Sequence, residues 1–159
     1  MHGQMASDLD KWDYRFLRMA MLVSHYSKDP MSKIGSVLVS HDRRYLSYGY
    51  NGFPRGISDD GRLHDRDLKR KLVEHAERNC LHNSPFDAFN LACTLYVTAP
   101  CCTECTKAII QHGVRRVVYL PFDFVGYWLE DLKLAKQMFQ EAGVVLVEAD
   151  PELLQDPGE

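Results

Sequence analysis

The sequence of 159 residues has no long hydrophobic run, no internal repeat and no marked excess of charge of one sign. A membrane-spanning helix needs about 20 consecutive apolar residues, and the chain has no such stretch. Its 19 basic and 22 acidic residues give a net charge of −3, which argues against a protein whose whole surface binds nucleic acid. With 45% hydrophobic and 26% charged residues, the composition is that of a globular protein.

The number and spacing of the cysteines do not fit a disulfide framework either. The chain has five cysteines, two of them adjacent at Cys101 and Cys102, and an odd number does not suit a fully paired set. Residues 1–12 are polar and lack the apolar core of a signal peptide. A reducing compartment favours metal ligation by cysteine over disulfide formation. We therefore expect a cytoplasmic protein, with no membrane association, whose cysteines bind a metal.

The length fits one domain spanning residues 1–159, with a core of about 12–148 and a loose tail at 151–159. Ser7 or Asp8 is expected to cap a first helix that runs to about His25. Hydrophobic periodicity predicts strands at 34–39, 44–50, 94–98, 114–120 and 144–147, and further helices at 62–82, 102–112 and 128–142, the first of them broken before His75. After the initial hairpin, strands alternate with helices. This order predicts an α/β protein with a central mixed five-stranded sheet and helices on both faces.

Two short motifs carry the chemistry. His75-Ala76-Glu77 opens a predicted helical segment, and Cys102-Thr103-Glu104-Cys105 opens the next helix. A neutral imidazole and two thiolates suit zinc, and three protein ligands leave one position free for water, as in catalytic sites. Glu77 is then a carboxylate that does not ligate and can shuttle protons. His-x-Glu followed by Pro-Cys-x-x-Cys is the signature of zinc-dependent nucleobase deaminases.

Either Cys101 or Cys102 follows Pro100 closely enough to be the first thiolate ligand. Counting back from Cys105, the two-residue gap of the signature selects Cys102 and puts Cys101 at a position outside the ligand set. A purely structural interpretation stays open, in which His75 makes an ordinary polar contact and the cysteine pair is half of a zinc knuckle. Cys80 and Cys93 are expected to pack in the core as small apolar groups.

With these motifs in place, the chain resembles the cytidine and deoxycytidylate deaminase family from about residue 12 to residue 147. The segments that carry the resemblance are 27–35, 49–56, 75–79 and 102–113, and the Gly-Tyr-Asn-Gly loop at 49–52 is most similar to the deoxycytidylate branch. The resemblance implies a three-layer cytidine deaminase-like fold. It also implies hydrolysis of dCMP to dUMP and ammonia, which supplies thymidylate synthesis, with one catalytic Zn2+ per chain.

The resemblance also implies three substrate contacts. Asn51 should contact the nucleotide, the backbone of Ala76 should meet the pyrimidine edge, and Arg55 should bind the phosphate. On local chemistry alone, Asn51 before Gly52 is equally a turn residue. Tyr127 and Trp128 could cap the base, although aromatic residues at the start of a helix commonly belong to the core.

Members of this family form hexamers or dimers, and many are controlled by dCTP and dTTP together with Mg2+, so the resemblance implies a homo-oligomer with such an allosteric nucleotide. The competing expectations are a deaminase for cytidine, a modified dCMP, guanine or tRNA adenosine, and a zinc-stabilised binding protein without turnover. A tRNA enzyme would need a broad basic face, which a net charge of −3 does not favour. Glu77 argues against the binding protein, because a structural zinc site needs no spare carboxylate.

Overall fold

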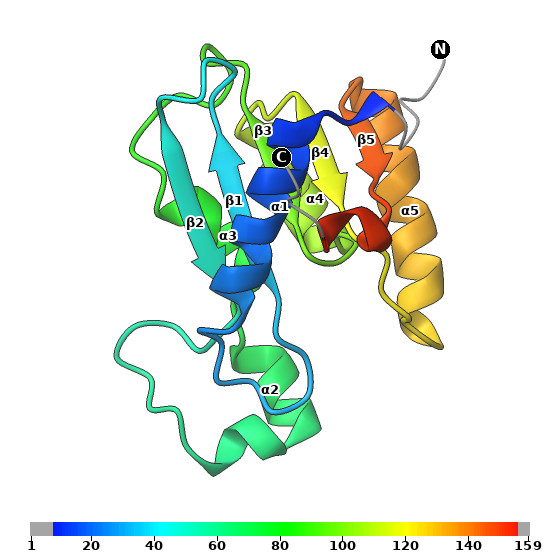
Figure 1. The fold of residues 1–159 in the computed structure, drawn as a ribbon. Helices are drawn as coiled ribbons and strands as arrows, with labels where there is room; N and C mark the ends of the chain where they lie inside the picture. The colour runs from blue at the N-terminus through cyan, green and yellow to red at the C-terminus, as the bar shows by residue number, and fades with distance from the viewer. Residues whose placement is uncertain (1–7, 156–159) are drawn as a thin grey trace.

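The computed structural model describes residues 8–155, and its centre is a five-stranded mixed sheet with the strand order β2-β1-β3-β4-β5 (Figure 1). The strands are β1 (Gly35–Val39), β2 (Leu46–Tyr50), β3 (Thr94–Val97), β4 (Arg116–Tyr119) and β5 (Val145–Glu148). β1 runs antiparallel to β2 and β3, whereas β3, β4 and β5 are parallel. The predicted hairpin and the five predicted strands are confirmed; the first four are slightly shorter than predicted, and the fifth is shifted by one residue.

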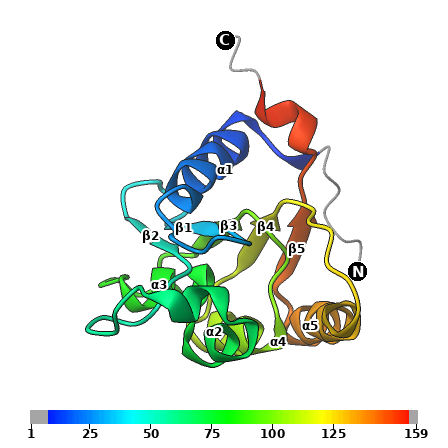
Figure 2. The same ribbon diagram turned by 90° about the horizontal axis from the view of Figure 1, so that it is seen from below.

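Helices cover both faces of the sheet (Figure 2). One face carries α1 (Lys11–Ser24) and the short 3-10 helix η3 (Pro151–Leu154), and the other carries α3 (Ala76–His82), α4 (Thr103–Gln111) and α5 (Tyr127–Ala142). The 3-10 helix η2 (Gly61–His64) and α2 (Arg66–Leu72) lie beyond one end of the sheet (Figure 1). The predicted three-layer α/β fold is confirmed. The predicted helix at 62–82 consists of η2, α2 and α3, with the expected break before His75.

Each face of the sheet has its own hydrophobic core because the central strands are buried on both sides. Alternate residues of the same strand point to opposite faces. Toward α1 point Val37, Val39, Tyr96 and Val118, and toward α3, α4 and α5 point Leu38, Leu95, Val97 and Val117. The second core also contains the cysteines, namely Cys80, Cys93, Cys101, Cys102 and Cys105. Among residues 8–155, no helix has both the length and the hydropathy needed to cross a lipid bilayer.

Two glycines allow the helices to approach the sheet closely. A Cβ atom at Gly35 would collide with the backbone of α1 at Ala20, and one at Gly49 would collide with the backbone of α3 at Cys80. The missing side chains therefore set the distance of α1 and α3 from the hairpin. For α3 this distance matters to function, because His75 and Glu77 lie at its first turn.

Both ends of the described chain differ from expectation. Asp10, rather than Ser7 or Asp8, caps α1, in a capping box in which Asp10 and Asp13 each accept a hydrogen bond from the other's backbone N–H at 3.0 Å. Ser7 lies outside the described residues. The tail expected to be loose is helical over Pro151–Leu154, where Leu154 packs against the core beside α1, and residues 156–159 lie outside the described part of the chain.

Candidate metal centre

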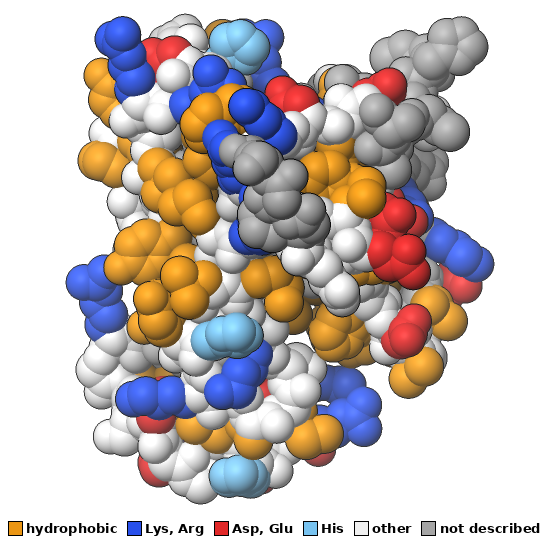
Figure 3. All heavy atoms as spheres, in the orientation of Figure 1, with side chains coloured by type: hydrophobic (Ala, Val, Ile, Leu, Met, Phe, Trp, Pro, Cys, Tyr) orange, Lys and Arg blue, Asp and Glu red, His pale blue; other side chains and the backbone are white. Residues whose placement is uncertain are grey.

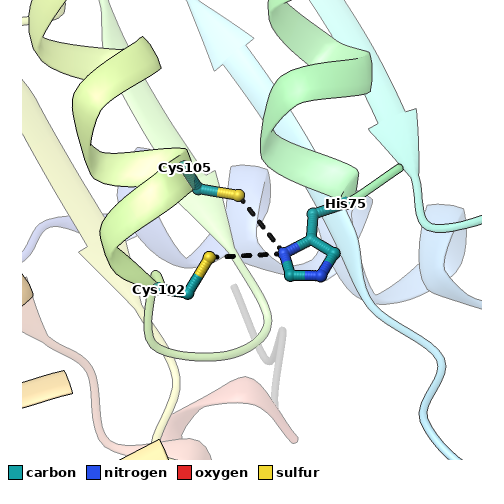
Figure 4. Close-up of side chains that lie close together, drawn as sticks. All are labelled: His75, Cys102 and Cys105. Carbon is teal, nitrogen blue, oxygen red and sulfur yellow. Dashed lines mark hydrogen bonds between the residues drawn. The ribbon is translucent and has the colours of Figure 1, made fainter. Parts of the chain in front are cut away.

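His75, Cys102 and Cys105 come together where the N-termini of two helices face each other (Figure 4). His75 is the N-cap residue of α3 and Cys102 is the N-cap residue of α4, with Cys105 in the first turn of that helix. Nδ1 of His75 lies 3.4 Å from both Sγ atoms, and the three donor atoms all lie within 4.8 Å of one another. Residues 27 and 30 positions apart in sequence therefore form one cluster.

The donor set and its spacing fit zinc. One imidazole nitrogen and two sulfurs are ligands that Zn2+ prefers, with bond lengths of about 2.1 Å to nitrogen and about 2.3 Å to sulfur. Tetrahedral geometry with these bond lengths separates nitrogen from sulfur by about 3.6 Å. The observed separations of 3.4 Å are close to this value. His75, Cys102 and Cys105 are thus the residues that would hold the ion.

Electrostatics around the cluster favour a thiolate at Cys102. A hydrogen bond from the Cys105 thiol and the neighbouring His75 together lower the pKa of Cys102 to about 4, against the opposing effect of burial. Cys105 is the proton donor of this pair, so the same hydrogen bond, together with burial, raises its pKa. Burial disfavours the charged form of His75, but its contact with the Cys102 thiolate and the nearby Glu77 raise its pKa. The partial positive charge at the N-terminus of α4 also favours anionic sulfur.

Glu77 lies beside the cluster without belonging to it. Its side chain is buried, and its Oε2 lies 3.5 Å from Sγ of Cys105. Burial raises the pKa of this carboxyl, while the neighbouring His75 opposes the rise. A buried carboxyl group with a raised pKa can both accept and return a proton. Glu77 is thus placed for proton transfer next to the three ligands.

The chain segment that leads into His75 is tied to the Asn51 loop. Gly52 N–H donates to the Glu74 carbonyl at 3.1 Å, and Glu74 N–H donates to the Gly52 carbonyl at 2.8 Å. Two residues after Glu74, the Ala76 carbonyl accepts a hydrogen bond from the Ser36 hydroxyl in β1 at 2.8 Å. These bonds fix the first turn of α3 against the hairpin and bring the Asn51 loop to the edge of the metal site.

The side chain of Asn51 is buried and makes two structural hydrogen bonds. Its Oδ1 accepts from Ile34 N–H at 2.8 Å, and its Nδ2 donates to the Ser32 carbonyl at 2.8 Å. An amide group offers two donor hydrogens and two acceptor lone pairs, so one of each is left by these bonds. Arg55 is exposed in the same loop, where its guanidinium lies 3.5 Å from Oδ1 of Asn83.

Cys101 is not part of the ligand group, as the spacing predicts, and lies in the core. Cys80 and Cys93 are also fully buried, and burial raises the pKa of Cys80 to about 12 and that of Cys93 to about 11. These values keep both groups protonated at neutral pH. All five cysteines thus pack in this core, and two of them, Cys102 and Cys105, also lie in the cluster with His75.

One contact between α4 and α5 near the cluster was not predicted from the sequence. Thr103 N–H donates to Oδ2 of Asp131 at 2.9 Å, and the Thr103 hydroxyl donates to Oδ1 at 2.8 Å. No local pattern marks an aspartate inside an amphipathic helix as the partner of a residue 28 positions earlier. Of the two aromatic residues considered as a cap over the base, Tyr127 is 72% exposed, whereas Trp128 packs against the core.

A buried carboxyl group beside one imidazole and two cysteine sulfurs, all at the N-termini of helices packed on a mixed sheet, defines a zinc-dependent deaminase. Residues 10–121 match the family model described as the cytidine and deoxycytidylate deaminase zinc-binding region. The chain belongs to this family.

Individual relatives agree with the family match. The chain is 37% identical to an uncharacterized deaminase of Aliivibrio fischeri over 139 residues, which cover 86% of this chain and 92% of that protein. It is 33% identical to the deoxycytidylate deaminase of Homo sapiens over 143 residues, with coverage of 86% and 79%. The solved dCMP deaminase of the cyanophage S-TIM5, in complex with dCMP and dUMP, matches with a TM-score of 0.71 at 25% identity and covers 88% of this chain and 98% of that one.

Proposed function

We propose that this protein hydrolyses dCMP to dUMP with release of ammonia. The observation that carries the proposal is the buried Glu77 beside the cluster of His75, Cys102 and Cys105. Relatives that bear the name deoxycytidylate deaminase, and the match to a structure that holds dCMP and dUMP, support this substrate over other amines. The product would supply the synthesis of thymidylate.

The reaction adds water at the ring carbon that carries the amino group and expels that group as ammonia. Zinc, when bound, lowers the pKa of water to about 7 and so supplies a nucleophile at neutral pH. Glu77 takes one proton from the attacking water and gives it to the ring nitrogen next to the carbon under attack. The carboxylate then passes the second water proton to the departing amine. Ammonia leaves and the carbonyl group of the product forms, so atoms and charges balance.

Three residues are proposed to hold the substrate. Asn51 lies in the loop that pairs with Glu74, next to His75. Its two structural hydrogen bonds leave one donor hydrogen and one acceptor lone pair of the amide for a substrate. Ala76 is buried at the first turn of α3, between His75 and Glu77, where its backbone can meet the pyrimidine edge. Arg55 is exposed on the same loop and is proposed to bind the phosphate, as a guanidinium matches phosphate oxygens in geometry.

Ammonia release from a panel of compounds tests the substrate. The zinc-loaded protein is assayed with dCMP, dCTP, deoxycytidine, cytidine, guanine and adenosine at matched concentrations. We expect turnover of dCMP that exceeds that of deoxycytidine and is reduced by Arg55→Ala. Activity on a nucleoside or free base without activity on dCMP would overturn the assignment. Lys71→Ala, which changes an exposed cation on α2, is the matched control for the loss of positive charge.

We also propose that the protein is a homo-oligomer, either a dimer or a hexamer. An uncovered apolar surface supports this (Figure 3). It lies over β2 and the adjoining side of α1, and it comprises Met19, Leu22, Tyr26, Leu46, Tyr48 and Tyr50. Apolar patches above a few hundred Å2 are uncommon on monomers. Light scattering after size exclusion measures the mass, and a monomer at micromolar concentration would contradict the proposal.

Control by dCTP and dTTP with Mg2+ is proposed from the family resemblance. Activity on dCMP is expected to rise with dCTP and to fall with dTTP, and to need Mg2+ for both effects. A rate that neither nucleotide changes would exclude this control. A cytoplasmic location is proposed from the five free cysteines, because thiols at a metal site persist in a reducing compartment.

A further inference from the structure

The helix that carries both sulfur ligands lacks a capping side chain of its own. The first backbone N–H groups of a helix have no partner within the helix and are usually satisfied by an oxygen of the N-cap side chain. In α4 the N-cap residue is Cys102, whose side chain makes no capping hydrogen bond. Its sulfur instead lies 3.4 Å from His75 Nδ1. Because the Cys102 side chain is directed to the metal cluster, it does not cap α4.

The missing cap comes from another helix. Asp131, in the second turn of α5, accepts the Thr103 N–H through Oδ2 at 2.9 Å and the Thr103 hydroxyl through Oδ1 at 2.8 Å. Both carboxylate oxygens thus bind the first residue of α4. Bonds to a charged acceptor are stronger than bonds between neutral groups. Two such bonds to Thr103 fix the position of α4 along its axis and its rotation about that axis.

Thr103 lies between the two sulfur ligands. Cys102 directly precedes it and Cys105 follows two residues later. A shift of the first turn of α4 moves both sulfurs relative to His75, which belongs to α3. Metal sites require ligand distances within about 0.2 Å of ideal values. Asp131, which lies outside the two helices that carry the ligands, thus constrains the ligand geometry through Thr103.

We propose that Asp131 is a positioning residue of the zinc centre, which acts through Thr103 to hold Cys102 and Cys105 in place against His75. This role rests on the zinc centre of the proposed function but not on the identity of the substrate. α5 also packs through Ala135 and Phe139, which are buried in the core, so the helix keeps its place when the carboxylate is removed.

The test measures zinc retention in the loaded protein. Wild type and Asp131→Ala are loaded with zinc and titrated with a chromophoric chelator, without substrate. Changes to groups that orient metal ligands commonly weaken affinity about 10–100-fold, and a loss of this size is expected. Asp131→Glu, which keeps the carboxylate, should recover part of the loss. Glu130→Ala is the matched control, because Glu130 is the neighbouring acid of α5 and pairs only with Lys133 among the described residues.

Thr103→Val tests the contact from the other side, since it removes the hydroxyl and keeps the backbone N–H. An intermediate loss of zinc affinity is expected, and the double variant Thr103→Val/Asp131→Ala should lose no more than Asp131→Ala alone. Losses that add would show that Asp131 acts without Thr103 and would overturn the proposal. The spectrum of the cobalt-substituted protein gives a second readout, because a displaced thiolate changes the band positions.

Two further results would also overturn it. One is unchanged zinc affinity in Asp131→Ala. The other is a fall in the melting temperature of the zinc-free protein with unchanged affinity, as expected for an ordinary contact between helices. If the wild type binds zinc but does not turn over dCMP, the substrate assignment fails and the role of Asp131 stands.

Discussion

The hydroxyl group of Ser36 donates a hydrogen bond to the carbonyl oxygen of Ala76 at 2.8 Å, and this bond joins β1 to the first residue of α3. Both residues are fully buried. Ser36→Ala removes the donor, and a typical buried hydrogen bond contributes about 1 kcal/mol, so we expect the free energy of unfolding to fall by about that amount. Urea denaturation measures it. Ser58→Ala, at an exposed position, should change the free energy of unfolding little. If Ser36→Ala and Ser58→Ala were equally stable, the role of the bond would be contradicted.

Gly49 sets the approach of α3 to the sheet. Gly49→Ala places a methyl group against the backbone of Cys80 and against the Ala76 carbonyl, and backbone atoms cannot move aside as a side chain end can. We expect a loss of about 3 kcal/mol or more in the free energy of unfolding. Gly61→Ala is the control, because nothing lies within 4 Å of the added atom. Thermal unfolding compares the two, and a Gly49→Ala variant as stable as Gly61→Ala would contradict this packing.

The free energy of unfolding should depend on pH in the acid range because of Asp13. Arg116 binds both oxygens of this buried carboxylate at 2.8 and 3.1 Å, and the Tyr96 hydroxyl donates to it at 2.6 Å. Burial acts to raise the pKa of Asp13, but the hydrogen bonds from Arg116 and Tyr96 outweigh it, and the pKa lies below the ordinary value of 3.8.

A depressed pKa means that the folded state binds its proton less readily than the unfolded state. The stabilisation by Asp13 is therefore complete above the unfolded pKa and is lost as the pH falls through the folded pKa. Asp13→Asn should lower stability at neutral pH by about 2 kcal/mol and flatten the decline below pH 4. Urea midpoints from pH 2.5 to 7 measure both effects. Asp123→Asn, at an exposed position, is the control, and parallel pH curves for wild type and Asp13→Asn would refute the link.

The two adjacent cysteines should differ in metal binding. Cys102→Ser removes one of three ligands, so the purified variant is expected to retain little zinc. Cys101→Ser changes a core residue outside the ligand group and should keep one zinc per chain while losing about 1–3 kcal/mol for a buried hydroxyl. Zinc per chain after dialysis measures the first effect, and denaturation measures the second. A zinc-free Cys101→Ser together with a zinc-loaded Cys102→Ser would reverse the ligand assignment.

Glu77→Gln separates metal binding from catalysis. The amide has nearly the shape of the carboxyl group but cannot exchange protons, so zinc content should match the wild type while ammonia release from dCMP falls. General acid and base catalysis contributes roughly 10²–10⁴-fold, which sets the expected loss. Glu104→Gln is the matched control, because Glu104 is exposed in the first turn of α4 and pairs with Lys107. Full activity of Glu77→Gln would exclude its role in proton transfer.

Local signals predicted most of the fold and named three side chains that lie close together in the structure. The run 94–98 is rich in β-branched and aromatic residues and ends shortly before Pro100, and its residues 94–97 form β3. The gap between Cys102 and Cys105 places both on one side of α4, and the same gap sets Cys101 apart from the ligands. Both inferences depend on residues that are close in sequence.

Contacts between distant segments were not predictable in this way. The partner of Thr103 is Asp131, and any of several acids on α5 satisfies the same local pattern. The cap of α1 was misplaced because Asp8 and Asp10 are both good caps, and only the reciprocal bond with Asp13 distinguishes them. The helical turn at Pro151–Leu154 did carry a signal, since Asp150 before a proline is a favoured start for a helix.

Asn79 in α3 and Asn83 at the C-cap of this helix cover the outer edge of β2. Asn51 N–H pairs with Ile34 of the neighbouring segment, so the backbone groups of Tyr48 and Tyr50 point away from β1. Asn83 Nδ2 donates to the Tyr48 carbonyl at 2.9 Å, and Asn79 Nδ2 donates to the Tyr50 carbonyl at 2.8 Å. An open strand edge is a template for pairing with another chain. Because Asn79 and Asn83 occupy these two acceptors, the outer edge of β2 offers fewer free carbonyl groups for another strand to pair with.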